Sequence, residues 1–142
     1  MDMNHPAFPE HLRKGERGSI RRHQRKVALK GAMDAAYAQA EAREANRSQV
    51  SGVYLVKGHV DLQLRLEHHH LVKRSRDRGL IADPTNIFIC SAIEHRLIED
   101  GKLVVEGRNA LDYRCHWSEG ATANERQMTR IKSRRWSQED EA

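Results

Sequence analysis

The spacing of apolar residues along the chain separates a long helical region from a region of short strands. From Ile20 to about Ala45 the sequence is rich in Ala, Arg, Lys, Glu and Gln, and its few large apolar residues fall at spacings typical of a helix. Ser19, just before this region, is a residue type that caps helix N-termini. After Asn46 the pattern changes to short apolar stretches punctuated by glycine, which is typical of strands.

Two strands are predicted in the middle of the chain. The apolar stretch Val53–Val56 indicates the first, and the alternating apolar residues from Val60 to Leu66 indicate the second. This alternation runs directly into three consecutive histidines, so the histidines are expected at the end of a strand. A basic loop follows, and Asp83–Thr85 predicts a turn before the short apolar stretch Ile87–Cys90.

A helix and a hairpin are predicted next. Ser91 is a suitable N-cap for a helix that reaches Asp100, where a glycine follows. The stretches Lys102–Glu106 and Leu111–Trp117 are predicted to pair as a β-hairpin across residues 107–109.

The two ends of the chain differ from the middle in composition. Residues 1–18 contain two of the three prolines and little apolar periodicity, which indicates a flexible arm. Thr122–Trp136 is predicted to be a basic helix, and the acidic cluster Glu139–Glu141 follows it. The predicted organisation is a flexible basic arm (1–18), a basic helix (19–46), one compact domain (47–118), and a C-terminal helix with an acidic tail (119–142).

Length and charge limit the classes of protein and partner. A chain of 142 residues with 38% hydrophobic residues is sufficient for one small domain. A formal net charge of +5 favours a polyanionic partner, and no apolar stretch approaches the roughly 20 residues that span a bilayer. We therefore expect nucleic acid as the partner, no membrane association, and a cytoplasmic location.

The cysteines and tryptophans are expected to have structural roles. Cys90 and Cys115 form no C-x-x-C pair, so neither a zinc ribbon nor a disulfide framework is indicated, and both are expected to be reduced and buried. Trp117 and Trp136 are expected to pack rather than to stack on bases.

Positive charge is concentrated between residues 11 and 30, where eight basic residues face one acid, Glu16. The basic residues are Arg13, Lys14, Arg17, Arg21, Arg22, Arg25, Lys26 and Lys30. Several recur at helical spacing and would repel one another unless an anion covered them, which makes Arg21, Arg22, Arg25 and Lys26 candidate contacts to nucleic acid. An ordinary solvated helix face is the alternative.

His69-His70-Leu71, Arg74-Ser75, Asn86 and, after eight further residues, His95 follow one another in this order. This order resembles the pattern of the HNH nuclease family, in particular of its small phage-like members: an aliphatic residue, His-His or Asp-His, an aliphatic residue and often Arg-Ser, then Asn, eight residues and His. The resemblance covers roughly residues 48–117. The resemblance implies an α+β fold with a ββα-metal core (the His-Me finger) and a following β-hairpin. The patterns above flank that core with a long basic N-terminal helix and a C-terminal helix.

The resemblance also implies roles for individual residues. His70, immediately before the aliphatic residue, corresponds to the general base, and His69 to a metal ligand. Asn86 corresponds to the residue that braces the loop carrying the base. His95 and Glu99 are four residues apart, so they share a helix face and are candidate ligands of the same cation. His68 is left without a role.

The implied activity is metal-dependent hydrolysis of DNA phosphodiester bonds, with nicking expected from a single finger. Neutral His70 would take a proton from the attacking water, while one divalent cation held by His69, His95 and Glu99 would supply compensating charge. Such a ligand set accepts magnesium, manganese, nickel or zinc. The basic loop residues Lys73, Arg74 and Arg76 are candidate phosphate contacts.

Other interpretations of the histidines, of Glu99 and of the function remain open. The histidine triplet suits a solvated strand end or an incidental metal binder, and Glu99 has Arg96 and Lys102 as alternative partners, with Asp100 as a substitute ligand. A non-catalytic nucleic-acid-binding module with a structural metal finger, or a ribonuclease of the same chemistry, are the alternative functions.

The chain departs from the family where many members carry paired cysteines. Ser48 and Ser51 occupy the positions of one pair, and Glu94 precedes His95 where cysteine is common. The structural zinc of those members is therefore expected to be absent. We expect the helix from Ile20 and the strand Leu111–Trp117 to supply the missing contacts.

Overall fold

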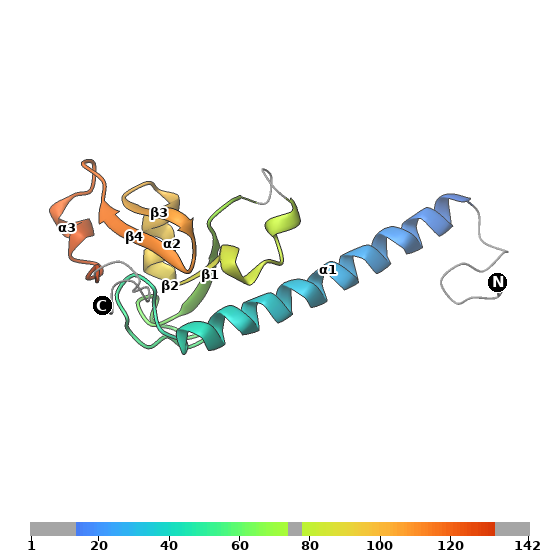
Figure 1. Ribbon diagram of the computed structural model, residues 1–142, viewed down its shortest axis with the longest axis horizontal. Coiled ribbons are helices and arrows are strands. Elements are labelled where there is room, and N and C mark those ends of the chain that lie inside the picture. The colour runs from blue at the N-terminus through green and yellow to red at the C-terminus, as the bar shows by residue number, and fades with distance from the viewer. Residues whose placement is uncertain (1–13, 74–77, 133–142) are drawn as a thin grey trace.

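The computed structural model describes residues 14–73 and 78–132. A long helix leads into an α+β body made of two small antiparallel sheets and two short helices (Figure 1). The elements are α1 (Lys14–Glu44), β1 (Leu66–His70), β2 (Ile87–Ser91), α2 (Ala92–Glu99), β3 (Leu103–Asn109), β4 (Asp112–Trp117) and α3 (Ala123–Arg126), with short 3₁₀ helices η1 (Arg78–Leu80) and η2 (Pro84–Asn86). No helix among these residues has the length and apolar character needed to cross a membrane.

The strands β1 and β2 pair antiparallel and are followed immediately by α2. His69 lies opposite Phe88 and His70 opposite Ile87 in this pairing. The predicted helix is confirmed, including its cap: the Ser91 side chain accepts a bond from the Glu94 backbone N–H, and the Glu94 side chain accepts one from the Ser91 backbone N–H. This reciprocal capping box turns the chain from the end of β2 directly into α2.

The strand β2 is the centre of the body, because all five of its side chains are buried. Alternation along the strand sends Ile87 and Ile89 to one side and Phe88 and Cys90 to the other. The first side packs with residues of α1, β1 and the segment between them: Ala36, Ala40, Leu55 and Leu66. The second side packs with Val50, which follows α1, and with residues of α2 and the β3–β4 hairpin: Leu97, Leu103 and Tyr113, with Trp117 partly buried beside them.

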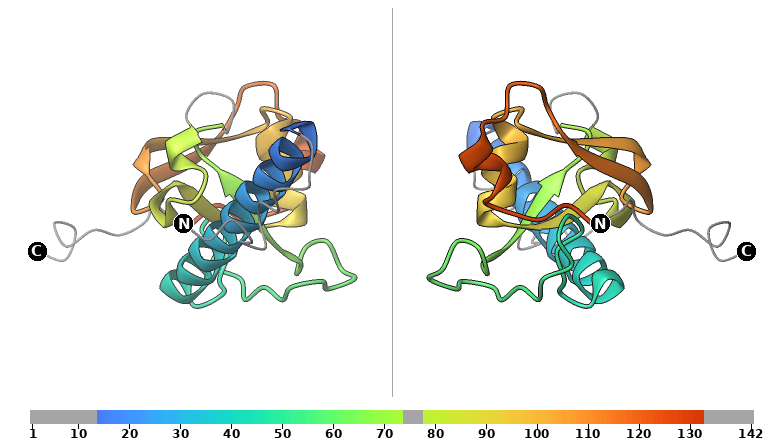
Figure 2. Two further views of the ribbon diagram at one scale, coloured as in Figure 1. Left: turned by 90° about the vertical axis from the view of Figure 1, so that its right-hand side faces the viewer. Right: turned by 90° about the vertical axis from the view of Figure 1, so that its left-hand side faces the viewer.

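Helix α1 is longer than predicted and is anchored only near its C-terminal end. It begins at Lys14 rather than Ile20, and Ser19 lies inside the helix, where its hydroxyl accepts a bond from Arg22. Ala36 and Ala40 are buried against the body, whereas all ten residues from 21 to 30 are exposed. The helix therefore projects beyond the body (Figure 1), and in the two end-on views of Figure 2 it lies in front of the body on the left and behind it on the right.

The two strands predicted between Val53 and Leu66 are largely absent. Single β-bridges join Arg47 to Tyr54 and Val56 to Arg65, and a regular strand starts only at Leu66. Leu55 and Leu66 are buried against β2, but Val53 and Val56 are exposed and Val60 is 88% exposed, so most of these apolar side chains do not line a sheet. Apolar alternation without a partner strand does not make a strand.

The predicted C-terminal helix is interrupted early. In the described part of this stretch, which ends at Lys132, only Ala123–Arg126 is helical, after which the chain returns to the body. The hydroxyl of Thr129 bonds to Glu94, and the backbone N–H of Lys132 donates to the Val50 carbonyl oxygen. These tertiary bonds replace helical ones. Trp136 and the acidic cluster lie outside the described residues.

The predicted hairpin is confirmed, but its turn is at Ala110 and Leu111, because residues 107–109, predicted as the turn, belong to β3 and carry a bulge. Strands β3 and β4 pair antiparallel, and the register shifts between Gly107 and Asn109. Gly107 has φ of 146°, and a Cβ there would lie 2.3 Å from the Asp112 carbonyl oxygen. Only glycine fits this position without displacing β4.

The two cysteines should resist alkylation in the native protein. Both are free, and burial raises the pKa of the Cys115 thiol to about 12, with the nearby Glu94 adding to the effect. Because the thiolate is the reactive form, Cys115 should react with iodoacetamide at pH 8 roughly 10³-fold more slowly than in urea. Mass spectrometry of timed samples measures this, and equal rates in both conditions would show that the site is open.

Candidate metal centre

Three of the predicted site residues meet beside α2. Donor atoms of His69, His95 and Glu99 lie within 4.8 Å of one another. One carboxylate oxygen, Oε1 of Glu99, is 3.3 Å from Nδ1 of His69 and 3.3 Å from Nε2 of His95. Two imidazole nitrogens and a carboxylate oxygen converging in this way are a typical donor set for a divalent transition metal.

The local structure explains why these three side chains meet. His95 and Glu99 lie one turn apart on α2, so both point to the same side of the helix. The capping box fixes α2 at the end of β2, and β1 is the antiparallel neighbour of β2. His69, on the face of β1 that is turned to α2, is thereby brought to a ring distance of 5.3 Å from His95.

Burial and charge favour the neutral, metal-binding form of His69. Burial lowers the pKa of His69 below its ordinary value, and the neighbouring His95 lowers it further, while Glu99 partly opposes both effects. Because a metal displaces the proton from a ligating nitrogen, a lowered pKa reduces the number of protons that binding must release. The chemistry of the donor set thus fits a metal ion.

Glu67 also contacts this group of residues, which the sequence patterns did not predict. Its Oε1 lies 2.8 Å from Nδ1 of His95. A carboxylate on one ring nitrogen fixes the tautomer and the orientation of a histidine, so that the other nitrogen, Nε2, faces Glu99. The available signal was strand alternation, since Glu67 is two residues before His69 and therefore shares its face.

Replacing Glu67 by glutamine should weaken metal binding about 10- to 100-fold, because a neutral amide orients the His95 ring less strongly than a carboxylate does. Isothermal titration with Zn²⁺ and Mn²⁺ measures the affinities of both proteins. Glu119→Gln, at an exposed position after β4, is the control and should bind like the unsubstituted protein. Unchanged affinity in Glu67→Gln would show that this carboxylate does not orient a ligand.

The proposed general base, His70, lies on the opposite face of β1 from the metal group. Its Nε2 is 3.0 Å from the carbonyl oxygen of Ile81, and its ring meets Tyr37 of α1 edge-on at 6.0 Å. Because a carbonyl oxygen only accepts, Nε2 must carry the proton. In the neutral imidazole this leaves Nδ1 unprotonated and able to accept a proton.

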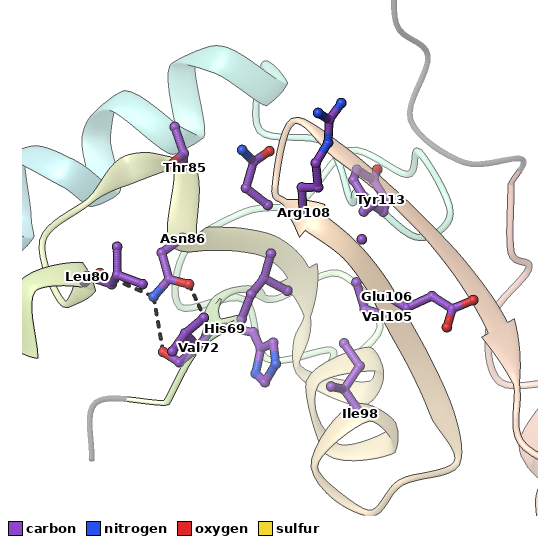
Figure 3. Close-up of a pocket in the computed structure, with 13 residues that line it drawn as sticks. His69, Val72, Leu80, Thr85, Asn86, Ile98, Val105, Glu106, Arg108 and Tyr113 are labelled. Carbon is purple, nitrogen blue, oxygen red and sulfur yellow. Dashed lines mark hydrogen bonds between the residues drawn. The ribbon is translucent and has the colours of Figure 1, made fainter. Parts of the chain in front are cut away.

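The Asn86 side chain bonds to the backbone on both sides of the basic loop, and we call these bonds the Asn86 clamp. Its Nδ2 donates to the carbonyl oxygens of Val72 and Leu80, and its Oδ1 accepts from the Val72 backbone N–H (Figure 3). Asn86 is 5% exposed. Leu80 precedes Ile81, whose carbonyl oxygen bonds to His70, so the clamp fixes the group that orients this histidine. The arrangement matches the bracing geometry expected for Asn86.

His68, to which the family pattern gives no role in catalysis or metal binding, has a defined place in the packing of the protein. Its Nε2 lies 2.6 Å from Oε2 of Glu41, and its ring stacks on Tyr37 with centroids 4.1 Å apart. Lys57 binds the other oxygen of Glu41. Since Tyr37 and Glu41 both belong to α1, His68 fastens β1 to the long helix.

Glu99 lies beside His69 and His95 rather than beside the alternative partners that the sequence offers. Lys102 instead donates to the Gly120 carbonyl oxygen and pairs with Glu125, while Arg96 is exposed. Asp100 forms the C-cap of α2 rather than facing the two histidines.

Glu94 and Ser48 meet in a buried polar cluster, which we call the Glu94 cluster. Oε1 of Glu94 accepts bonds from the Ser48 hydroxyl at 2.6 Å and from the Ser91 backbone N–H, and Oε2 accepts from the Thr129 hydroxyl at 2.6 Å. Ser51 donates its backbone N–H to the Ser48 hydroxyl oxygen. Three segments distant in sequence are thus joined beside the candidate ligand His95.

The predicted phosphate contacts are dispersed. Lys73 is exposed next to the Asn86 clamp, whereas Arg74 and Arg76 lie outside the described residues. Four more are exposed on the projecting part of α1: Arg21, Arg22, Arg25 and Lys26.

Comparison of the chain with protein-family models, curated proteins and solved structures found no match.

Proposed function

We propose that this protein is a metal-dependent endonuclease of the HNH type that hydrolyses phosphodiester bonds in DNA. The observation that carries the proposal is the convergence of His69, His95 and Glu99 beside a strand whose next residue, His70, has one ring nitrogen held by a backbone carbonyl oxygen. The order of these residues and of Asn86 along the chain resembles the HNH pattern.

The chemistry assigns a separate task to each residue. His69, His95 and Glu99 would hold one divalent cation, which supplies positive charge against the negative charge that builds up on the phosphate oxygens. Nδ1 of His70 accepts the proton of the attacking water. Asn86 is a positioning residue, because it holds the backbone that aims His70.

The position of β1 allows both faces of the strand to serve one reaction. Within the described residues, β1 pairs only with β2, and the strand ends at His70. A phosphate lying beyond this end of the strand would be approached by His69 from one face and by His70 from the other. We therefore place the scissile phosphate there.

The exposed basic part of α1 is oriented toward the same side of the body. Residues three or four apart share a helix face, and one such row runs through Arg22, Lys26, Leu29, Met33, Ala36 and Ala40. Ala36 and Ala40 are buried against the body, and Tyr37 beside them contacts His68 and His70. Arg22 and Lys26 lie further along this same face of α1, so positive charge continues outward from the region of the proposed base. This favours a polyanionic substrate that lies along the helix.

Replacing Arg22 and Lys26 by alanine should lower the affinity for duplex DNA about 10-fold and reduce the slope of log K against log salt by roughly 2, because two phosphate contacts are removed. Fluorescence anisotropy at several salt concentrations measures both quantities. Arg114→Ala with Arg130→Ala removes the same charge from exposed positions on the body and is the control. Equal losses in the two double variants would assign the effect to net charge alone.

Cleavage of supercoiled plasmid tests the proposed function. We expect nicked circles as the first product with magnesium, manganese, nickel or zinc, and no product with chelator. His95→Ala should abolish metal-dependent cleavage and retain DNA binding. No cleavage in any metal, with salt-sensitive DNA binding intact, would favour a non-catalytic nucleic-acid-binding module, and cleavage of RNA alone would favour a ribonuclease.

A further inference from the structure

A cavity of about 300 Å³ adjoins the candidate metal centre. His69, Val72 and Asn86 form one wall, and Val105 of β3 belongs to the opposite wall, with Ile98 of α2 between them (Figure 3). The cavity therefore lies between the metal-ligand strand β1 and the β3–β4 hairpin. Any group in it is next to His69 and to the clamp formed by Asn86.

We propose that this cavity binds the nucleoside attached to the cleaved phosphate. The inference rests on the proposed function and deepens it. It assigns to the cavity one nucleoside unit, with its base unpaired, as the ligand. Ligand pockets start at roughly 300 Å³, so this cavity is of a size for a single nucleoside and not for a base pair.

The lining suits the two kinds of surface that a nucleoside presents. Val72, Leu80, Ile98 and Val105 offer apolar contact for the faces of a base. Thr85 and Asn109 add polar groups for its edge or for the sugar. Oδ1 of Asn109 accepts a bond from the Leu111 backbone N–H, which makes Nδ2 the donor that the amide presents. Apolar and polar groups thus share the lining of the cavity, as the apolar faces and polar edge of a base require.

The bulge in β3 shapes the cavity wall. The register shift between Gly107 and Asn109 lies within the segment of β3 that lines the cavity. A Cβ at Gly107 would lie 2.6 Å from Cα of Tyr113, so a side chain there would force β3 and β4 apart. Bulges beside functional sites commonly re-aim neighbouring side chains, here those of Arg108 and Asn109.

The test combines nucleotide binding with cleavage. In the full chain, methyl NMR signals of Ile98 and Val105 should shift on titration with deoxynucleoside 5′-monophosphates to about 10 mM, with and without magnesium, and should not shift with inorganic phosphate. Val72→Trp should remove these shifts and raise the KM for a single-stranded oligonucleotide about 10-fold, because the indole fills the cavity. Val72 is partly exposed and its bonds to Asn86 are made by the backbone, so the fold tolerates this change.

Val56→Trp is the matched control, since Val56 is also an exposed valine but does not line the cavity. It should retain both the shifts and the KM. Nucleotide shifts without any cleavage would support the cavity assignment and overturn the nuclease. Cleavage without shifts, and with equal KM in the two tryptophan variants, would overturn the cavity assignment and leave the nuclease standing. Equal shifts with inorganic phosphate would also overturn it.

Discussion

The His70→Ala variant should cleave DNA about 10²- to 10⁴-fold more slowly than the unsubstituted protein, with unchanged affinity for metal and DNA. His70 accepts the proton of the attacking water in the proposed chemistry, and it lies on the face of β1 away from the candidate ligands. Its removal should therefore affect the chemical step and not the metal site. Single-turnover cleavage, metal titration and anisotropy measure the three quantities.

Two further measurements separate a lost base from a damaged fold. Added imidazole should restore part of the activity of His70→Ala, because it can occupy the vacated space and accept the proton. His116→Ala removes a partly exposed histidine from β4 and should cleave normally. Equal cleavage rates in His70→Ala and the unsubstituted protein would move the general base to another group.

Glu94→Ala should destabilise the protein by about 3 kcal/mol. Glu94 is 1% exposed and accepts bonds from Ser48, Ser91 and Thr129. Its removal leaves two buried donors, on Ser48 and Ser91, and one partly buried donor, on Thr129, without their acceptor and opens a cavity beside α2. The expected change lowers the folding equilibrium constant by more than 100-fold and is measured by urea unfolding monitored by circular dichroism.

Glu94→Gln separates loss of hydrogen bonds from loss of volume. The amide keeps one oxygen for Ser48 and Ser91, but its nitrogen cannot accept from Thr129, so an intermediate loss is expected. Glu119→Ala, at an exposed glutamate, should change stability by less than about 0.5 kcal/mol. A loss below about 1 kcal/mol in Glu94→Ala would show that the Glu94 cluster does not hold the three segments together.

The sequence was sufficient for features that short-range interactions determine. The helix α2 could be read from Ser91 and its apolar spacing, and the shared face of His95 and Glu99 follows from helix geometry alone. The β3–β4 hairpin could likewise be read from two apolar strands around a turn. These elements depend on neighbours a few residues away, so local sequence is enough to predict them.

The tertiary structure decided features that depend on distant partners. Val53–Val56 has strand-forming residues but no sheet to join, and the segment after Arg126 exchanges helical bonds for contacts with Glu94 and Val50. His68 acquires its place only because Glu41 of α1 lies beside it, and Glu67 only because α2 brings His95 within reach. The sequence by itself determined the order of the candidate ligand types. The packing of β1 between α1 and α2 determined what each histidine faces, because only folding fixes what surrounds a strand.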